Sequence, residues 1–333
     1  MLGNKTDREK VLLIGGGGFL GTTLLERLHS DYEVVCLDRG TRYARLEPAS
    51  TSVRFVRGTA DDIGHLFAGE HFNHLFYLAG GNAVRVAGAK EAESESARRA
   101  LDATIEFLLA SGNRTALTYF SSYLCYASSE ARLTEDSTVG DSPYAQLHRM
   151  NEDSLRASGI LHAVVRLSTV YGRYGFTGEL HSGGVLGRFI SLMVQSKPVR
   201  INNGGLDGMD FLCQEDFVTA CRKRLENGTA SGIYNLGSGT LTSIARLASI
   251  LNDALFETTG LRSEMTYANA DPAIRPEYRY CATEKFEQAF GWKAKHSVEQ
   301  EAPRLLAEEL KALGSRLPSA NLLSNTRDLE IGA

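Results

Sequence analysis

The sequence lacks the features of several protein classes. No apolar run reaches the roughly 20 residues that span a membrane, and the first ten residues are polar, so we expect neither a membrane segment nor a signal peptide. Basic residues are not in excess, since the formal net charge is −4. Charge-driven binding to nucleic acid is therefore disfavoured. We expect a cytoplasmic globular protein with no nucleic-acid or membrane partner.

Cysteine pairs are missing as well. The five cysteines are odd in number and scattered, with no C-x-x-C pair: Cys36, Cys125, Cys213, Cys221 and Cys281. This spacing argues against a disulfide framework and a structural zinc site, and it is typical of reduced thiols. We expect no metal site, and we interpret Cys125 as a packing residue.

The sequence does contain a glycine-rich turn between two strongly patterned segments near its start. The run 11–14 is apolar, as in a buried parallel strand, and leucines at helical spacing follow in 22–29. Between them, Gly15, Gly18 and Gly21 stand three residues apart. Glycines let a phosphate approach the backbone, and the new helix presents its N–H groups and dipole. The stretch predicts a dinucleotide pyrophosphate site.

An acidic residue stands where such a site requires one. Asp38 ends the next apolar run, about twenty residues after the first glycines. A carboxylate at this position accepts a hydrogen bond from a ribose 2′-hydroxyl and repels a 2′-phosphate. The predicted cofactor is therefore NAD rather than NADP, and Arg39 beside it could contact the adenine.

Strands and helices alternate along the first half of the chain. This alternation predicts an α/β fold with a doubly wound parallel sheet. Strands are expected over 53–57, 74–79, 116–120 and 160–167, and helices over 92–110 and 143–158. From about Tyr171 the composition becomes glycine-rich. Helices are expected over 185–195, 216–226, 244–256, 283–290 and 298–313. We predict a dinucleotide-binding domain over 8–170, a mainly substrate-binding smaller domain over 171–314 from which some segments return to the first, and a mobile tail over 315–333.

Two stretches carry reactive side chains. Ser122 follows the strand expected over 116–120, and Tyr144 lies in the first turn of the next helix. Ligands of open α/β sheets bind outside the carboxyl ends of the strands, so both side chains are expected to meet a substrate. A tyrosine acts as a base only when its pKa, ordinarily about 10, is pulled toward neutrality, and a nearby cation does this.

Together these motifs resemble an extended short-chain dehydrogenase/reductase of the NAD-dependent epimerase/dehydratase type, which acts on nucleotide sugars. The resemblance covers about 10–301. It rests on the glycine loop at 15–21, Leu-Ala-Gly at 78–80, Ser-Ser at 121–122, Ser-Pro-Tyr at 142–144, Arg-Leu-Ser-Thr-Val-Tyr-Gly at 166–172, Asp-Phe-Leu at 210–212, Tyr-Asn-Leu-Gly-Ser-Gly at 234–239 and Phe-Gly-Trp at 290–292. It implies a Rossmann-type fold, NAD, a sugar substrate that is nucleotide-linked, and a homodimer formed through helices 92–110 and 143–158.

The resemblance also implies roles by position. Ser122 matches the residue that hydrogen-bonds the reacting sugar oxygen, and Tyr144 matches the catalytic acid/base. Cofactor contacts are implied for Gly15, Gly18, Phe19, Leu20, Gly21, Asp38, Arg39, Thr59, Ala60, Leu78, Ala79, Gly80, Tyr144 and His148. Asp61 and Asp62 could take over the adenine contact from Thr59 and Ala60. Substrate contacts are expected for Ser122, Thr169, Arg275 and, in a glycine-rich loop, His181.

Position 148 departs from the family pattern. The family has Tyr-x-x-x-Lys, whereas Tyr144 is followed four residues later by His148. A histidine with a pKa near 6.5 is largely neutral at pH 7 unless its surroundings shift it. Three possibilities stay open: His148 donates to the nicotinamide ribose, it is charged beside the tyrosinate, or redox chemistry is weakened.

The substrate half departs from the pattern too. Met209 stands where the family has an arginine that grips a diphosphate, and Thr169 stands where it has an asparagine; Arg275 remains as a second anion ligand. Because a neutral side chain cannot replace an arginine clamp, we expect the substrate to be either an unusual nucleotide sugar or a compound without a nucleotide. Tyr123 and Leu124 replace the acidic pair of the 4,6-dehydratases, which argues against that reaction.

The predicted function is NAD-dependent epimerisation or ketone reduction of a sugar. Tyr144 takes a proton from a sugar hydroxyl, Ser122 orients the oxygen, and NAD receives the hydride. Two alternatives remain: a non-redox elimination or isomerisation with NAD retained, and an NAD-binding sensor without catalysis. Structural roles are expected for Arg166 in a salt bridge, for Asp216 as a helix cap or loop anchor, and for Trp292 as a core anchor of the smaller domain.

Overall fold

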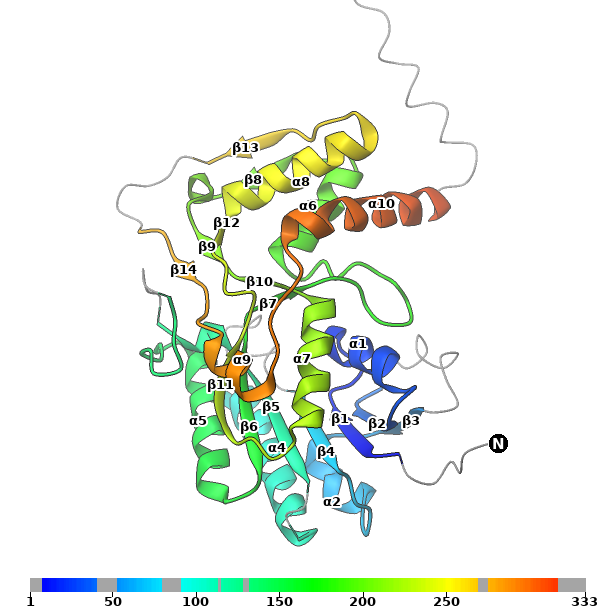
Figure 1. The fold of residues 1–333 in the computed structure, drawn as a ribbon, viewed down its shortest axis with the longest axis vertical. Coiled ribbons are helices and arrows are strands. Elements are labelled where there is room, and N and C mark those ends of the chain that lie inside the picture. Colours follow the sequence, from blue (N-terminus) through cyan, green and yellow to red (C-terminus); the bar gives the residue numbers. More distant parts are fainter. Residues whose placement is uncertain are drawn as a thin grey trace, which may run out of the picture. The chain divides into compact units, whose positions relative to one another are not determined.

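The computed structural model describes residues 8–40, 53–79, 91–112, 115–127, 132–268 and 275–316 (Figure 1). The chain divides into two compact units. Unit 1 comprises Met1–His181, Gly208–Leu241 and Glu277–His296, and unit 2 comprises Ser182–Asp207, Thr242–Pro276 and Ser297–Ala333. The division predicted at 170/171 stays a prediction. Most of the predicted tail, residues 317–333, lies outside the described residues.

Unit 1 is built on a seven-stranded sheet in which neighbouring strands are parallel. The strand order is β11-β6-β5-β4-β1-β2-β3. The strands are β1 (Lys10–Ile14), β2 (Glu33–Asp38), β3 (Val53–Arg57), β4 (His74–Tyr77), β5 (Ala116–Ser122), β6 (His162–Leu167) and β11 (Gly232–Leu236). The predicted doubly wound sheet is confirmed. Its order reverses between β1 and β4, and the carboxyl ends of these strands are the place where such a sheet binds ligands.

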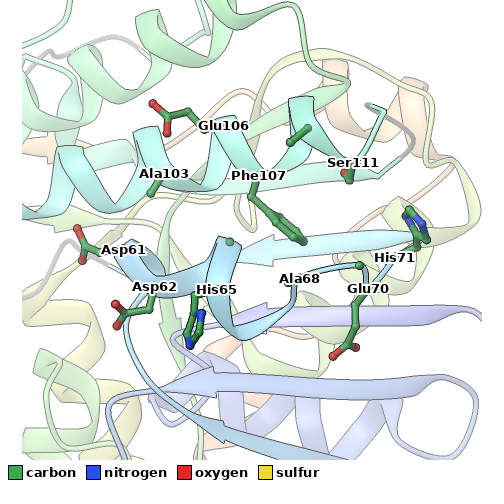
Figure 2. A pocket seen from close by; sticks show the side chains of 13 residues that line it. Asp61, Asp62, His65, Ala68, Glu70, His71, Ala103, Glu106, Phe107 and Ser111 are labelled. Carbon is green, nitrogen blue, oxygen red and sulfur yellow. The ribbon is translucent and has the colours of Figure 1, made fainter.

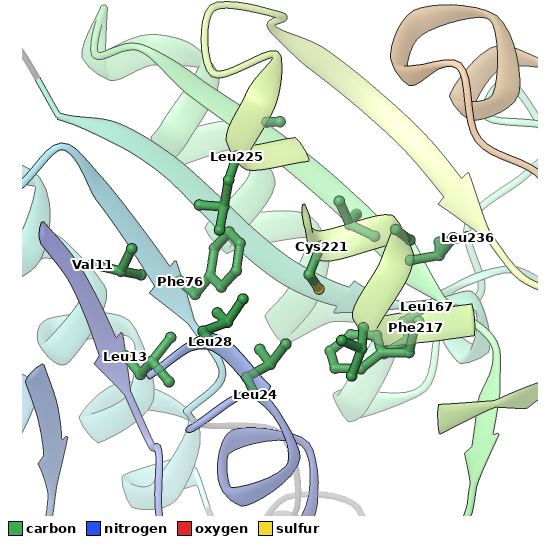
Figure 3. Close-up of a cluster of buried hydrophobic side chains, with 14 of the residues drawn as sticks. Val11, Leu13, Leu24, Leu28, Phe76, Leu167, Phe217, Cys221, Leu225 and Leu236 are labelled. Atoms are coloured by element: carbon green, nitrogen blue, oxygen red, sulfur yellow. The ribbon is translucent and has the colours of Figure 1, made fainter. Parts of the chain in front are cut away.

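Helices cover both faces of this sheet, because successive residues of a strand point to opposite sides. Val11 and Leu13 of β1 belong to one buried cluster, while Leu12 and Ile14 belong to the other. The first cluster takes in α1 (Phe19–Leu28), α7 (Gln214–Glu226) and α9 (Glu284–Phe290); Figure 3 shows side chains of α1 and α7 on the strands. The second takes in α2 (Ile63–Leu66), α4 (Glu91–Ala110) and α5 (Pro143–Ser158).

Local sequence signals set the ends of α5. The hydroxyl of Ser142 accepts a hydrogen bond from the Ala145 N–H (3.1 Å), and Pro143 occupies the first turn, where its missing N–H costs nothing. Gly159 ends the helix in the left-handed region, with φ of 72°. The predicted helix over 143–158 is confirmed with both of its bounds.

Short elements complete unit 1. A 3-10 turn, η2 (Ala60–Asp62), precedes α2, and another, η3 (Tyr123–Cys125), follows β5. Two small parallel pairs are β7 (Thr169–Tyr171) with β10 (Phe211–Cys213), and β9 (Gly208–Met209) with β14 (Tyr278–Arg279). The expected place of Trp292 in the smaller domain is wrong. Its ring packs edge-on against Phe286, and its indole N–H donates to Thr219 (2.9 Å), because α9 returns the chain to the large sheet.

Unit 2 is a small helical layer with one strand pair. Helices α6 (Val185–Val194), α8 (Ile244–Thr259) and α10 (Val298–Arg316) pack against one another. Strand β8 (Val199–Ile201) is parallel to β13 (Met265–Tyr267), and η4 (Asn203–Gly205) and β12 (Thr242–Ser243) are short. Ser243 caps α8, since its hydroxyl accepts the Arg246 N–H (3.1 Å). Within the described residues, no helix is both long enough and apolar enough to cross a membrane.

A substitution at Gly21 tests how closely α1 approaches the glycine loop. A Cβ atom added to Gly21 would run into the backbone of Gly16, which cannot move without disturbing the loop. Gly21→Ala is therefore expected to lower the free energy of unfolding by roughly 1–3 kcal/mol, as overpacking does. Urea unfolding measures this change.

Gly64 of α2 is the matched control, because a Cβ atom there meets nothing within 4 Å. Gly64→Ala is expected to leave stability unchanged or to raise it by up to about 1 kcal/mol. Equal stabilities of the two variants would contradict the proposed close approach.

Candidate active site

The glycine loop forms a polar cradle between β1 and α1. Gly15 has a φ of +81°, and a Cβ atom there would lie 3.0 Å from the backbone nitrogen of Ala79. Gly18 is the N-cap of α1, and no side chain of the described residues caps the helix. The first N–H groups of α1 thus need another partner. Bare backbone and an uncapped helix N-terminus fit a pyrophosphate.

Asp38 lies beside this loop at the end of β2. One carboxylate oxygen accepts the N–H of Gly17 (3.0 Å), and the other accepts the N–H of Gly40 (3.0 Å). A carboxylate oxygen can accept more than one hydrogen bond. Arg39 next to it is exposed. The arrangement fits a ribose at the loop, and the roles of both residues stay predictions.

The remaining cofactor candidates follow the neighbouring strands. Leu78 and Ala79 come directly after β4, which ends at Tyr77 rather than at the expected residue 79, and the Leu78 N–H donates to the Ile14 carbonyl (2.9 Å). Gly80 lies outside the described residues. The sheet therefore brings these candidates to the same edge as the glycine loop.

Thr59 and Ala60 follow β3. The Thr59 hydroxyl donates to the carboxylate of Asp62 (3.0 Å), and Ala60 is buried. Asp61 and Asp62, the alternative adenine contacts, line a hollow of about 540 Å³ between α2 and α4 (Figure 2). Among the other residues lining this hollow are Glu106 of α4 and His65 of α2. The two aspartates thus border this hollow, and their part in binding adenine stays a prediction.

The loop over 172–181 folds against the glycine loop. The ring of His181 stacks on Phe19, the first residue of α1, with centroids 4.2 Å apart and planes 3° from parallel. Tyr174 meets both rings edge-on at 5.5 Å. The Gly175 N–H donates to the Thr22 hydroxyl (3.2 Å) and ties the loop to α1. His181, expected as a substrate contact, therefore touches the cofactor cradle itself.

Ser122 and Tyr144 come to the same edge from different elements. Ser122 is the last residue of β5, and its hydroxyl oxygen accepts the Leu124 N–H (3.2 Å). Helix α5 packs against β5 and η3 and carries Tyr144 in its first turn. Both side chains are partly exposed, so both can reach a ligand.

His148 lies one turn after Tyr144 on the same face of α5. The two rings meet edge-on with centroids 4.6 Å apart. The Nδ1 atom is 2.9 Å from the Tyr119 hydroxyl, to which the Asn151 amide donates (2.9 Å). Burial, and to a smaller extent the charge of Arg166, lower the pKa of His148 to about 4. These surroundings favour a neutral imidazole at pH 7 and argue against a charged imidazole beside the tyrosinate.

A buried ion pair holds α5 to the sheet beneath these residues. Arg166 of β6 contacts both carboxylate oxygens of Glu152, at 2.6 and 3.1 Å, and both side chains are about 95% buried. The Ser121 hydroxyl donates to the same carboxylate (2.7 Å), and Arg166 also donates to the Tyr126 hydroxyl (2.9 Å). The structural role predicted for Arg166 is confirmed.

The other candidate residues are Thr169, Arg275, Asp216 and Cys125. The Thr169 hydroxyl is 2.8 Å from that of Tyr123, and Arg275 is an exposed residue of unit 2. Asp216 accepts the N–H groups of residues 295 and 296, which confirms it as a loop anchor. Burial raises the pKa of the Cys125 thiol to about 12, in agreement with its predicted packing role.

The structure adds four residues that the sequence analysis did not single out: Tyr119, Asn151, Glu152 and Tyr174. A periodicity argument could have found two of them. Asn151 and Glu152 lie three and four residues after His148, on its face of the helix. Tyr119 and Tyr174 carry no such signal, because their partners lie on other elements of the chain. Among the described residues, no group of His, Cys, Asp and Glu could hold a metal ion.

Comparisons with known proteins agree with this geometry. The sequence model of the NAD dependent epimerase/dehydratase family matches residues 11–237. The dTDP-D-glucose 4,6-dehydratase of Mus musculus is 24% identical over 316 residues, which cover 86% of this chain and 84% of that protein. The trifunctional UDP-glucose 4,6-dehydratase/UDP-4-keto-6-deoxy-D-glucose 3,5-epimerase/UDP-4-keto-L-rhamnose-reductase of Arabidopsis thaliana is 23% identical over 309 residues. Those residues cover 85% of this chain and 45% of that protein, so the chain spans less than half the length of this relative.

Solved structures share the fold. The UDP-glucose 4-epimerase of Thermotoga maritima, solved with UDP-glucose, superposes with a TM-score of 0.76 at 22% identity, covering 91% of this chain and 99% of that one. WbmG of Bordetella bronchiseptica, solved with NAD, has a TM-score of 0.75 at 21% identity, covering 93% and 96%.

The Arg166–Glu152 pair predicts a large stability effect. Arg166→Met leaves the Glu152 carboxylate buried without its counter-charge, which is expected to cost about 3–5 kcal/mol in urea unfolding. The double variant Arg166→Met/Glu152→Leu removes both charges and is expected to recover most of that loss. A single variant that costs under about 1 kcal/mol would contradict this account of the pair.

His148 predicts a pH-dependent stability. Above pH 6.5 the imidazole is neutral in the folded and unfolded states. Between 6.5 and about 4 the unfolded chain binds a proton that the folded protein does not, so stability falls as the pH falls. With about 1.4 kcal/mol per tenfold change, this loss amounts to roughly 3 kcal/mol. Between pH 7 and pH 4, the His148→Gln variant is expected to lose about 3 kcal/mol less stability than the unchanged protein, as measured by urea unfolding. Equal losses in the two proteins would contradict this account of His148.

Proposed function

Because the chain belongs to the NAD-dependent epimerase/dehydratase family, we propose that it is an epimerase or ketoreductase of a nucleotide-linked sugar. The cofactor of the family is NAD. The observation that supports the proposal most is the placement of the glycine cradle and the Ser122–Tyr144 pair at one edge of the sheet of unit 1. A homodimer through α4 and α5, which expose Leu109 and Met150, remains part of the proposal.

The residues present fit NAD. The cradle at Gly15–Gly21 would hold the pyrophosphate on the N-terminus of α1, and Asp38 would accept the ribose hydroxyls. The stacked rings of His181 and Phe19 would lie beside the phosphates, on the side of the loop over 172–181. When bound, NAD supplies the hydride acceptor and donor of the reaction.

Tyr144 and Ser122 would handle the proton. The Ser122 oxygen already accepts the Leu124 N–H, so its own proton can be donated to a sugar oxygen and hold that oxygen in place. Tyr144 would take the hydroxyl proton as the alcohol becomes a ketone, and return it in the reverse direction. An epimerase needs both directions in one turnover, and a reductase needs only the second.

Dehydration is disfavoured by the residues after Ser122. Elimination of water needs an acid/base pair, and the next two residues are Tyr123 and Leu124. The Tyr123 hydroxyl is engaged with Thr169, and burial raises its pKa far above the ordinary value. The 4,6-dehydratase activity named for the mouse relative is therefore not the reaction proposed for this chain.

The substrate class follows from the relatives and from one departure. The names of similar proteins include UDP-glucose and dTDP-glucose, and we propose a nucleoside-diphosphate sugar here. Arg275 is the proposed diphosphate ligand, since Met209 cannot serve as one. Thr169 is proposed to contact the sugar.

A second function is favoured by the neutral His148. With a neutral imidazole at position 148 in place of the family's lysine, one means of stabilising the tyrosinate is lost. An elimination or isomerisation in which Tyr144 acts as a protonated acid would not need that cation. A substrate deuterated at the carbinol carbon separates the two, because only the redox reactions would transfer that deuterium to the nicotinamide. A ketoreductase running in reverse would leave it on the cofactor, and an epimerase would return it to the opposite face of the same carbon.

Tyr144→Phe tests the proposed chemistry. Removing the hydroxyl is expected to lower turnover of UDP- or dTDP-hexoses by about 10²–10⁴-fold, the usual contribution of a general acid/base. The affinity for NAD, measured by calorimetry, is expected to change by less than about threefold, because the phenol is only one of many cofactor contacts.

Tyr267→Phe, an exposed position in unit 2, is the control and is expected to keep full turnover. Failure of the unchanged protein to bind NAD would overturn the proposed function. Full turnover in Tyr144→Phe would overturn the assigned role of Tyr144.

A further inference from the structure

A half-buried cation lies on the short strand β14. The side chain of Arg279 is 18% exposed, and its Nη1 atom donates to the Tyr126 carbonyl (3.0 Å). Tyr126 follows η3, the turn that begins directly after Ser122, and its own N–H donates to the Tyr123 carbonyl (3.2 Å). The guanidinium therefore lies beside the turn that follows Ser122, and all of these residues belong to unit 1.

The neighbouring strand supplies no charge at this place. Strand β14 is parallel to β9, and Arg279 stands opposite Met209 in the register of the pair. Residues paired in this way point to the same face of a sheet. Met209 packs against the buried cluster that contains Tyr123 and Tyr126, so the shared face is the one toward η3. Arg279 is the charged residue of this strand pair, because the other paired residues are uncharged.

A carboxylate from the same segment covers the guanidinium. The Oε2 atom of Glu277 accepts from Nε (3.3 Å) and from Nη2 (3.1 Å) of Arg279. Both N–H groups thus meet one oxygen, whereas the fork of an arginine fits two oxygens best. Arg54 and Glu70 of the same unit show that better fit, since two nitrogens of Arg54 meet two oxygens of Glu70, at 3.0 and 2.6 Å. Glu277 therefore neutralises Arg279 without matching its fork.

We propose that Arg279 binds phosphate oxygens of the substrate's diphosphate, and that Glu277 is an internal substitute for this anion, which leaves when the substrate binds. The inference rests on the proposed function, because that function has a nucleoside-diphosphate sugar as its substrate. A diphosphate presents several oxygens and more than one negative charge, so it fills the fork in the bidentate way. Arg279 would act in addition to Arg275.

The exchange of the two anions costs the protein little free energy. A solvent-screened ion pair contributes little to stability, because water weakens the attraction and both side chains lose freedom in it. The side chain of Glu277 is 59% exposed, so the displaced carboxylate stays in contact with water and no charge is buried without a partner. The hydrogen bond from Nη1 to the Tyr126 carbonyl keeps the guanidinium in place during the exchange.

Glu277→Gln separates this proposal from a purely structural ion pair. The variant is expected to bind UDP and dTDP about three- to fivefold more tightly than the unchanged protein, because the diphosphate no longer competes with a carboxylate. Calorimetry in the presence of saturating NAD measures the affinity, since NAD then occupies the pyrophosphate site of the cradle. An unchanged or lower affinity would overturn the role of Glu277.

Arg279→Met removes the guanidinium. It is expected to weaken binding of UDP by about 10- to 100-fold, the value of hydrogen bonds between charged groups. Arg279→Lys keeps the charge but not the fork, and it is expected to lie between the two. Urea unfolding checks that both variants fold. Uridine lacks the diphosphate, so its affinity is expected to be the same in all of these proteins. Unchanged UDP affinity in Arg279→Met, or an equal loss for uridine, would overturn the inference.

The double variant Arg279→Met/Glu277→Gln tests whether the two residues act on one site. If Glu277 competes with the ligand for Arg279, its substitution is expected to raise the UDP affinity less when Arg279 is absent. Equal gains in the two backgrounds would show that Glu277 acts only by charge repulsion, and they would overturn its role as a substitute anion.

Arg54→Met is the matched control. Arg54 is also an ion-paired arginine on a strand of unit 1, but it stands near the amino end of β3, away from the edge that carries Ser122. Its loss is expected to leave the UDP affinity unchanged, and the NAD affinity is expected to stay within about twofold in every variant. Binding of neither UDP nor dTDP by the unchanged protein would overturn the inference, whereas failure to bind NAD would overturn the proposed function itself.

Discussion

The ion pair between Arg166 and Glu152 is the interaction on which the site depends. It is buried where β5, β6 and α5 meet, and it fixes the helix that carries Tyr144 and His148 against the strand that ends at Ser122. Because an isolated charge in this interior would be costly, neither partner can move without the other. The edge that carries the proposed acid/base residues is thus positioned by charges that do not themselves reach it.

This pair also shapes the electrostatics around His148. The cation of Arg166 is committed to Glu152 and opposes a second positive charge nearby, while burial works in the same direction. A neutral imidazole therefore stands where the family pattern has a lysine. The consequence concerns chemistry rather than architecture. The sheet is that of the family, whereas the residue four positions after the proposed acid/base Tyr144 differs in charge from the lysine of the family pattern.

Much of the fold could be predicted because it depends on patterns among residues that are close in the sequence. The strand–glycine–helix unit and the helix over 143–158 depend on residues that are close in the sequence, and the structure has both as expected. The predicted place of Trp292 was wrong because it depends on a contact with a residue far away in the sequence. The return of α9 to the large sheet depends on packing with Phe286 and Thr219, and no signal in neighbouring residues records it.

The fold class, the glycine cradle with Asp38, and the candidates Ser122, Tyr144 and His148 could all be inferred from local sequence patterns. The environment of His148 became visible only in the folded chain, where burial and the charge of Arg166 on β6 lower its pKa. The same holds for His181, whose stacking on Phe19 joins residues 162 positions apart. Spacing along a chain reports side chains of one element, whereas desolvation and hydrogen-bond direction are set by whichever elements the fold brings together.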